Sequence, residues 1–206
     1  MLRPFSEQML GATDLSAQSL DLSKLSASLP KTDLAFQLHA TENGDGKLTL
    51  NNAAAGVYNE NRIPLSNLAV EFTQKDSLFN LDHIAAHLGS LRQTAGNLHG
   101  KGSYNNGALA LTLTTDALDL QKLDQRIRAT KLSGKLDVQH SEGKQNISLA
   151  LSEPLKQNKL LLNVHAIVAD DAANIDQISL RAGASAIDAS APVSYTHLTL
   201  PTICSV

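Results

Sequence analysis

The sequence predicts an all-β protein built from antiparallel strands, and three observations support this fold class. Short segments throughout the chain alternate apolar and polar residues, the pattern of a strand with one dry face and one wetter face. Turn-forming residues separate these segments. A leucine-rich motif also occurs twice, ninety-eight residues apart. Such long-period self-similarity indicates a strand layer that recurs.

The clearest alternation lies at 108–115, ALALTLTT, where Leu109, Leu111 and Leu113 share one side. Turns rich in Asn, Asp and Gly between the segments are typical of hairpins. Helix is expected only at 6–10 and at 78–91. The other alternating segments are 47–50, 68–72, 135–139, 146–152 and 160–168, and the turns are 43–46, 105–107 and 142–144.

Two motifs of the first half return in the second half in the same order. Residues 20–38 and 118–136 match at eight of nineteen positions, including LDLSKL and LDLQKL. LDHIAAHLG at 81–89 pairs with IDQISLRAG at 175–183. The period is too long for ankyrin or leucine-rich repeats. We therefore expect two repeat layers, 1–97 and 98–192, in which the motifs occupy equivalent places.

The composition and charge of the chain limit the classes of function that it can have. Of 206 residues, 42% are hydrophobic but only 3% aromatic, so the core should be aliphatic. The net charge is −3 and the basic residues are scattered, so no nucleic-acid partner is expected. No apolar run approaches the roughly 20 residues that span a bilayer. The first residues do not resemble a signal peptide, so either the protein is cytosolic or its targeting segment lies outside this chain.

The last residues resemble sequence of another origin. VSYTHLTLPT at 193–202 resembles a translated sequencing adapter, although its alternation also fits a genuine strand. We expect 193–206 to be a non-native tail and the natural protein to be longer. The tail contains Cys204, the only cysteine. The rest of the chain therefore predicts no disulfide, thiol nucleophile or Cys-ligated metal.

Motifs for chemistry are weak. TENGDGKLTL at 41–50 is similar to a calcium loop, but Thr41 and Asn52 stand where Asp and Glu are needed, so a hairpin turn is expected. His83 and His87 would share a helical face like zinc ligands, but no third ligand accompanies them. We expect exposed histidines on a surface turn. Without a catalytic constellation, the sequence predicts neither an enzyme nor a cofactor.

The repeated phrases resemble the AsmA-like superfamily of Gram-negative bacteria, and within it the TamB branch of the translocation and assembly module. The features that carry the resemblance are LDLSKL, LDLQKL, TKLSGKLDVQ at 130–139 and the run 81–104. It implies an internal fragment whose repeated antiparallel layers form an elongated open groove, a β-taco. It also implies a periplasmic location, with an inner-membrane anchor absent from this chain.

The function that the resemblance implies is phospholipid transport to the outer membrane, outer-membrane protein assembly and secretion, or both. A BamA-like outer-membrane barrel (TamA-type) would be the partner, bound through the missing C-terminus. The alternative is a β-solenoid passenger or adhesin, whose apolar face is a closed core.

Three strand segments supply the candidate site. Antiparallel pairing would align their apolar faces into one aliphatic wall, which suits acyl chains because these need only apolar surface. We therefore expect a groove that binds phospholipid acyl chains, with Leu111 and Leu149 near its centre. The candidate residues are Leu109, Leu111, Leu113, Leu136, Val138, Ile147, Leu149 and Leu151.

Overall fold

The computed structural model describes residues 11–153, 160–169 and 172–194, and its fold is all-β as expected. Within these residues twelve strands form one sheet, and three single-turn 3₁₀-helices lie in the connections. The elements are β1 Thr13–Leu20, η1 Leu22–Lys24, β2 Leu34–Ala40, β3 Asp45–Asn52, η2 Tyr58–Glu60, β4 Leu65–Lys75, β5 Leu78–Gly89, β6 Thr94–Asn105, β7 Ala108–Leu118, η3 Leu120–Lys122, β8 Leu132–Ser141, β9 Lys144–Ser152, β10 Leu160–Ala169, β11 Ala172–Ala182 and β12 Ser185–Ser194.

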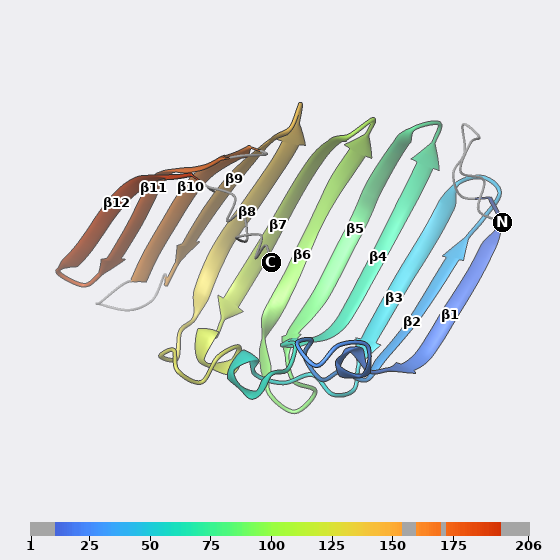
Figure 1. Ribbon diagram of the computed structural model, residues 1–206, viewed down its shortest axis with the longest axis horizontal. Helices are drawn as coiled ribbons and strands as arrows, with labels where there is room; N and C mark the ends of the chain where they lie inside the picture. Colours follow the sequence, from blue (N-terminus) through green and yellow to red (C-terminus); the bar gives the residue numbers. More distant parts are fainter. Residues whose placement is uncertain (1–10, 154–159, 170–171, 195–206) are drawn as a thin grey trace, which may run out of the picture.

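Each strand pairs antiparallel with the next strand in the chain, so the sheet is an open meander with β1 and β12 at its ends (Figure 1). Strands in a sheet lie about 4.8 Å apart, so twelve of them extend over roughly 50 Å. The described residues add no second layer to this sheet. The elongated open architecture therefore agrees with the predicted groove-like sheet.

The two long edges of the sheet differ. At one edge the described connections are short turns, and Asn106 and Gly107 both have the positive φ of a tight hairpin turn. At the other edge three connections are longer and contain 3₁₀-helices, whereas residues 90–93 and 183–184 form short turns. We call four connections at this second edge, residues 21–33, 53–64, 90–93 and 119–131, the rim.

The repeat of 20–38 and 118–136 is confirmed in three dimensions. Each segment leaves its strand after a residue of positive φ, Ser19 in the first and Ala117 in the second. Each then forms a 3₁₀-turn capped by an Asp side chain, Asp21 or Asp119, and enters the next strand. The shared Leu and Asp residues therefore form the same type of connection at both places in the chain.

The second motif pair also occupies equivalent strands, β5 and β11. The β5–β6 pairing shifts register between Leu81 and Ile84, and the β11–β12 pairing shifts between Ile175 and Ile178, which are ninety-four residues later. Both motif pairs therefore relate strands that are six apart in the one continuous sheet, β1 to β7 and β5 to β11. Residue 97, after which we expected the second layer to begin, lies within β6.

The prediction of a helix at 78–91 is wrong, because residues 78–89 form strand β5. The irregularity between Leu81 and Ile84 explains the error. An extra residue in a strand moves the next apolar side chain from i+2 to i+3, which imitates helical spacing. His83 and His87 are exposed as expected, but they lie in a strand and not on a turn.

Other expectations have mixed outcomes. Residues 41–44 do form the turn between β2 and β3, as expected for the sequence similar to a calcium loop. The possible helix at 6–10 lies outside the described residues. Of the expected tail 193–206, only 193 and 194 are described, at the end of β12.

A small core anchors the rim to the sheet. Leu118, Leu132 and Leu151 are buried against one another, and Leu120 and Leu123 of the 119–131 connection pack on them. Leucines of the repeated motif therefore pack over the strands at the rim edge, whereas the middle of the strands forms a single layer.

Candidate functional site

The candidate residues lie side by side on one face of β7, β8 and β9. Leu111 pairs with Val138, which pairs with Ile147. One step towards the rim, Leu113 pairs with Leu136, which pairs with Leu149. All six are half-buried. The antiparallel register therefore joins the three segments into two continuous aliphatic ladders.

Two candidates lie at the margins of this group. Leu109 pairs with Tyr104 on one side and His140 on the other, so it borders polar side chains near the hairpin edge. Leu151 pairs with Gly134 and is buried in the rim core. The structure thus centres the aliphatic area on Leu111 and Leu113 and their partners.

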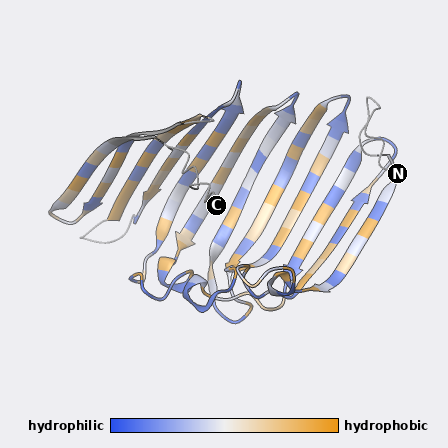
Figure 2. Ribbon diagram, in the orientation of Figure 1, coloured by the Kyte–Doolittle hydropathy of each residue, from blue (hydrophilic) through white to orange (hydrophobic). Residues whose placement is uncertain are grey.

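The same ladders continue across the whole sheet, and we call the surface they form the aliphatic face. Figure 2 shows the alternation of apolar and polar residues along the strands that produces it. The central ladder is Leu15, Leu38, Leu48, Val70, Ile84, Gly100, Leu113, Leu136, Leu149, Val164, Ile178 and Ala189. The ladder beside it includes Ala40, Gly46, Phe72, Leu81, Gly102, Leu111, Val138, Ile147 and Ala166.

Glycines within these ladders make room for large neighbours. A Cβ on Gly46 would collide with the ring of Phe72, so this ring lies over the glycine. A Cβ on Gly100 would likewise meet the backbone and side chain of Leu113. The apolar side chains therefore lean sideways over the backbone, and this explains why many are half-buried on a single-layer sheet.

The aliphatic face has a hollow of about 100 Å³ near the rim. Four candidate residues line it: Leu113, Leu136, Leu149 and Leu151. An engineered apolar cavity of about 150 Å³ holds a benzene ring, so this hollow suits a short alkyl segment and not a whole lipid.

The opposite face of the same strands is polar. Thr112 Oγ1 donates a hydrogen bond of 2.7 Å to Asp137 Oδ1, and Lys135 Nζ lies 2.9 Å from the same oxygen. The hydrogen bond from Lys135 and that from Thr112 lower the pKa of Asp137. Lys47 donates to Glu71 at 3.0 Å. The two faces thus differ sharply, since charged pairs lie on one face and aliphatic ladders on the other.

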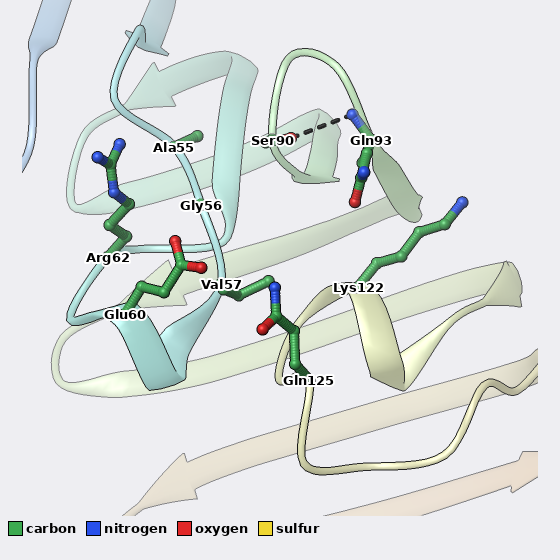
Figure 3. Close-up of a pocket in the computed structure, with 9 residues that line it drawn as sticks. All are labelled: Ala55, Gly56, Val57, Glu60, Arg62, Ser90, Gln93, Lys122 and Gln125. Atoms are coloured by element: carbon green, nitrogen blue, oxygen red, sulfur yellow. Dashed lines mark hydrogen bonds between the residues drawn. The ribbon is translucent and has the colours of Figure 1, made fainter.

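A second concavity, of about 170 Å³, lies among the rim connections (Figure 3). Its charged residues do not converge on one point. Arg62 donates to the carbonyl of Ala54, and Lys122 donates to the carbonyl of Thr94. Both cations are thus engaged with the backbone, and we assign no chemistry to this pocket.

Among the described residues, no group of His, Cys, Asp or Glu is arranged to hold a metal ion. No helix in the same part of the chain is long and apolar enough to span a membrane. Comparison with models of protein families, with curated proteins and with solved structures finds no match.

Sequence reasoning missed most of the aliphatic face. Strands β2 to β5 contribute Leu38, Leu48, Val70 and Ile84, and β10 contributes Val164. The segments of β2, β3, β4 and β10 carry the same alternation, and this signal could have found their residues, whereas the bulge in β5 conceals Ile84. Their alignment with Leu113 depends on the register of every intervening pair, which the alternation of a single strand does not specify.

Proposed function

We propose that this chain is a segment of a lipid-handling groove protein of the AsmA-like type, whose aliphatic face binds phospholipid acyl chains. The observation that carries the proposal is the aliphatic face itself, which runs across the sheet with no second layer among the described residues. Exposed apolar areas larger than a few hundred Å² are rare on proteins that bind nothing.

The chemistry of the face suits acyl chains better than a specific small ligand. Its two central ladders offer Leu, Ile, Val and Ala side chains with few hydrogen-bonding groups. Such a surface recognises length and apolarity without selecting one molecule. The polar opposite face, with pairs such as Lys47 and Glu71, keeps the other side of the sheet in water.

The wider role rests on the sequence resemblance. On that basis the protein acts in the periplasm in phospholipid transport to the outer membrane, in outer-membrane protein assembly and secretion, or in both. Attachment to the inner membrane and contact with a BamA-like barrel would involve segments beyond this chain.

Photo-crosslinking in Gram-negative cells that produce the protein tests the acyl-chain proposal. A photoreactive residue at Leu111 or Leu149 should capture phospholipid. The same residue at Ala110, which neighbours Leu111 but is exposed on the polar face, or at Lys144 near a turn should not. Equal labelling at Ala110 and Leu111, or labelling at neither Leu111 nor Leu149, would contradict the proposal and favour a closed core of the passenger type.

A further inference from the structure

The rim carries an unusual number of exposed large apolar side chains. Two of them, Leu25 and Leu91, are 69% and 68% exposed. Single exposed leucines need no explanation, but their concentration along one edge does. Of the eight exposed large hydrophobic residues in the described chain, five lie in the rim: Leu25, Leu29, Tyr58, Leu91 and Ile127.

Basic residues are interspersed with these apolar ones. The rim contains eight Lys and Arg residues against five Asp and Glu residues. In the described turns of the opposite edge, at 41–44, 76–77, 106–107 and 142–143, the charged residues are Glu42, Asp76 and Glu142. The basic rim residues are Lys24, Lys31, Arg62, Arg92, Lys122, Arg126, Arg128 and Lys131.

The acidic residues of the rim are mostly turned inward. Asp21 and Asp119 accept hydrogen bonds from the backbone of their own connections. Asp124 is paired with Arg126, and its side chain is 11% exposed. Only Asp33 and Glu60 of these five are exposed, whereas six of the eight basic residues are. Two of those six, Arg126 and Arg128, form ion pairs with Asp124 and Glu153, and the other four are Lys24, Lys31, Arg92 and Lys131. The outer surface of the rim is therefore positive.

The rim connections are also joined to one another. The Tyr58 N–H donates to the carbonyl of Leu123, and Asn59 accepts from the N–H of Gln125. The Lys31 N–H donates to the carbonyl of Asn61. These bonds link three of the four rim connections, 21–33, 53–64 and 119–131, which lie along the same edge of the sheet (Figure 1).

We propose that the rim docks on the surface of a bilayer that contains anionic phospholipid. Aliphatic side chains flanked by Lys and Arg match the two layers that such a surface presents, acyl chains below and phosphates above. An acidic protein or nucleic acid would require the charges but not the exposed leucines. This inference does not depend on acyl-chain binding by the aliphatic face. Rim docking would hold the strands upright on the bilayer, with the rim edge of the aliphatic face against the membrane.

Co-sedimentation of the 206-residue chain with vesicles tests the inference. Vesicles of phosphatidylcholine with about one-third phosphatidylglycerol should bind the chain, and raising the salt concentration should release it. Each basic residue near such a surface strengthens binding roughly fivefold, so the triple variant Lys24→Glu, Lys31→Glu and Arg92→Glu should lower partitioning about a hundredfold or more.

A charge-matched variant serves as the control, and an apolar variant gives a second test. Lys75→Glu, Lys101→Glu and Lys144→Glu together change the net charge equally, but these exposed residues lie outside the rim, so binding should be largely retained. The pair Leu25→Ser and Leu91→Ser leaves the charge unchanged and should weaken binding by about tenfold or more, since the leucines no longer enter the acyl layer. Both leucines are exposed, so neither change disturbs the fold.

Several results would overturn the inference. Equal binding by the rim triple variant and its charge-matched control would do so, as would equal binding to vesicles without phosphatidylglycerol. Rim-dependent binding to heparin without binding to vesicles would assign the rim to an acidic macromolecule. A fluorescent single-chain lipid below its critical micelle concentration reports on the aliphatic face separately, and the rim variants should bind it normally.

Discussion

Thr32 and Thr130 show how one side chain fixes a whole connection. The hydroxyl of Thr130 donates to the carbonyl of Leu118 and accepts from the N–H of Leu120. Thr32 makes the same two bonds to Leu20 and Leu22. Because a threonine hydroxyl both donates and accepts, it satisfies two backbone groups at the point where the chain leaves its strand.

Thr130→Val should therefore destabilise the fold. Valine keeps the shape of threonine but leaves a carbonyl and an N–H without partners in a site where Thr130 is 3% exposed. We expect a loss of about 1–3 kcal/mol in the free energy of unfolding. Urea denaturation measures it, with Thr49→Val in the middle of β3 as the control. A loss no greater than that of the control would show that water replaces the hydroxyl.

Asp124 should make stability depend on acid pH. The hydrogen bonds from Arg126, first through its side chain and then through its backbone N–H, lower the pKa of Asp124 from 3.8 to about 2. A carboxylate whose pKa is lowered by folding stabilises the protein above its unfolded pKa. This contribution is present at pH 5 and is lost as the pH falls through about 4 towards 2.

The variant Asp124→Asn isolates that contribution. It should be less stable than the parent chain at pH 5, and the difference should shrink as the pH falls to 2. Midpoints of urea denaturation at pH 5, 3 and 2 measure it. The other acidic groups are common to both chains, so they cancel in the comparison. A difference that is independent of pH would show that the carboxylate charge is not responsible.

At the scale of elements, the sequence predicted local structure correctly wherever a residue type had a single structural role. The Leu-Asp-Leu-x-x-Leu phrase predicted that two distant connections are equivalent, because the same leucines and aspartate form the same capped turn. Strand β5 shows the limit of such reasoning. Its bulge is a property of pairing with β6, so the spacing of Leu81 and Ile84 was ambiguous without the partner strand.

Exchange of the two equivalent connections should have unequal effects. Placing the sequence of 119–131 at 21–33 should be tolerated, since both have thirteen residues and the same Asp and Thr positions. The reverse exchange replaces Arg128 with proline and leaves the buried carboxylate of Glu153, 1% exposed, without its 2.9 Å ion pair. We expect it to cost about 2 kcal/mol or more.

Thermal unfolding of both chimaeras checks this prediction. The variant Arg128→Met alone should reproduce most of the loss in the reverse chimaera. If both exchanges are equally mild, the contact between Arg128 and Glu153 adds nothing to stability. If both unfold the chain, the connections are not equivalent despite their common geometry.

At the scale of the whole molecule, the fold class was predictable but the extent of the aliphatic face was not. Alternation within the segment that holds Leu109, Leu111 and Leu113 identified a strand with one dry side. The alignment of that side over twelve strands follows from eleven pairing registers, and a slip of one residue in any of them would turn a strand over. Alternation in a strand also does not reveal whether a second layer covers its dry side.

An uncovered face should make stability depend on acyl ligand. A single-chain lipid below its critical micelle concentration, at one hundred times its dissociation constant, should stabilise the chain by about 2.7 kcal/mol. For a chain of this size the melting temperature should rise by roughly 5–10 °C. Leu111→Arg should remove most of this rise. It should leave the unliganded melting temperature nearly unchanged, because on an open face the arginine stem lies on its neighbours and the charge reaches water.

Ala110→Arg is the matched control, since it adds the same charge on the polar face one residue away and should retain the full rise. In a closed core the outcome would be opposite, because burying a charge without a partner costs several kcal/mol and no ligand could enter. Unfolding of the Leu111→Arg chain, together with no ligand effect on the parent chain, would therefore assign the aliphatic face to a core. In that case the passenger interpretation would replace the lipid groove.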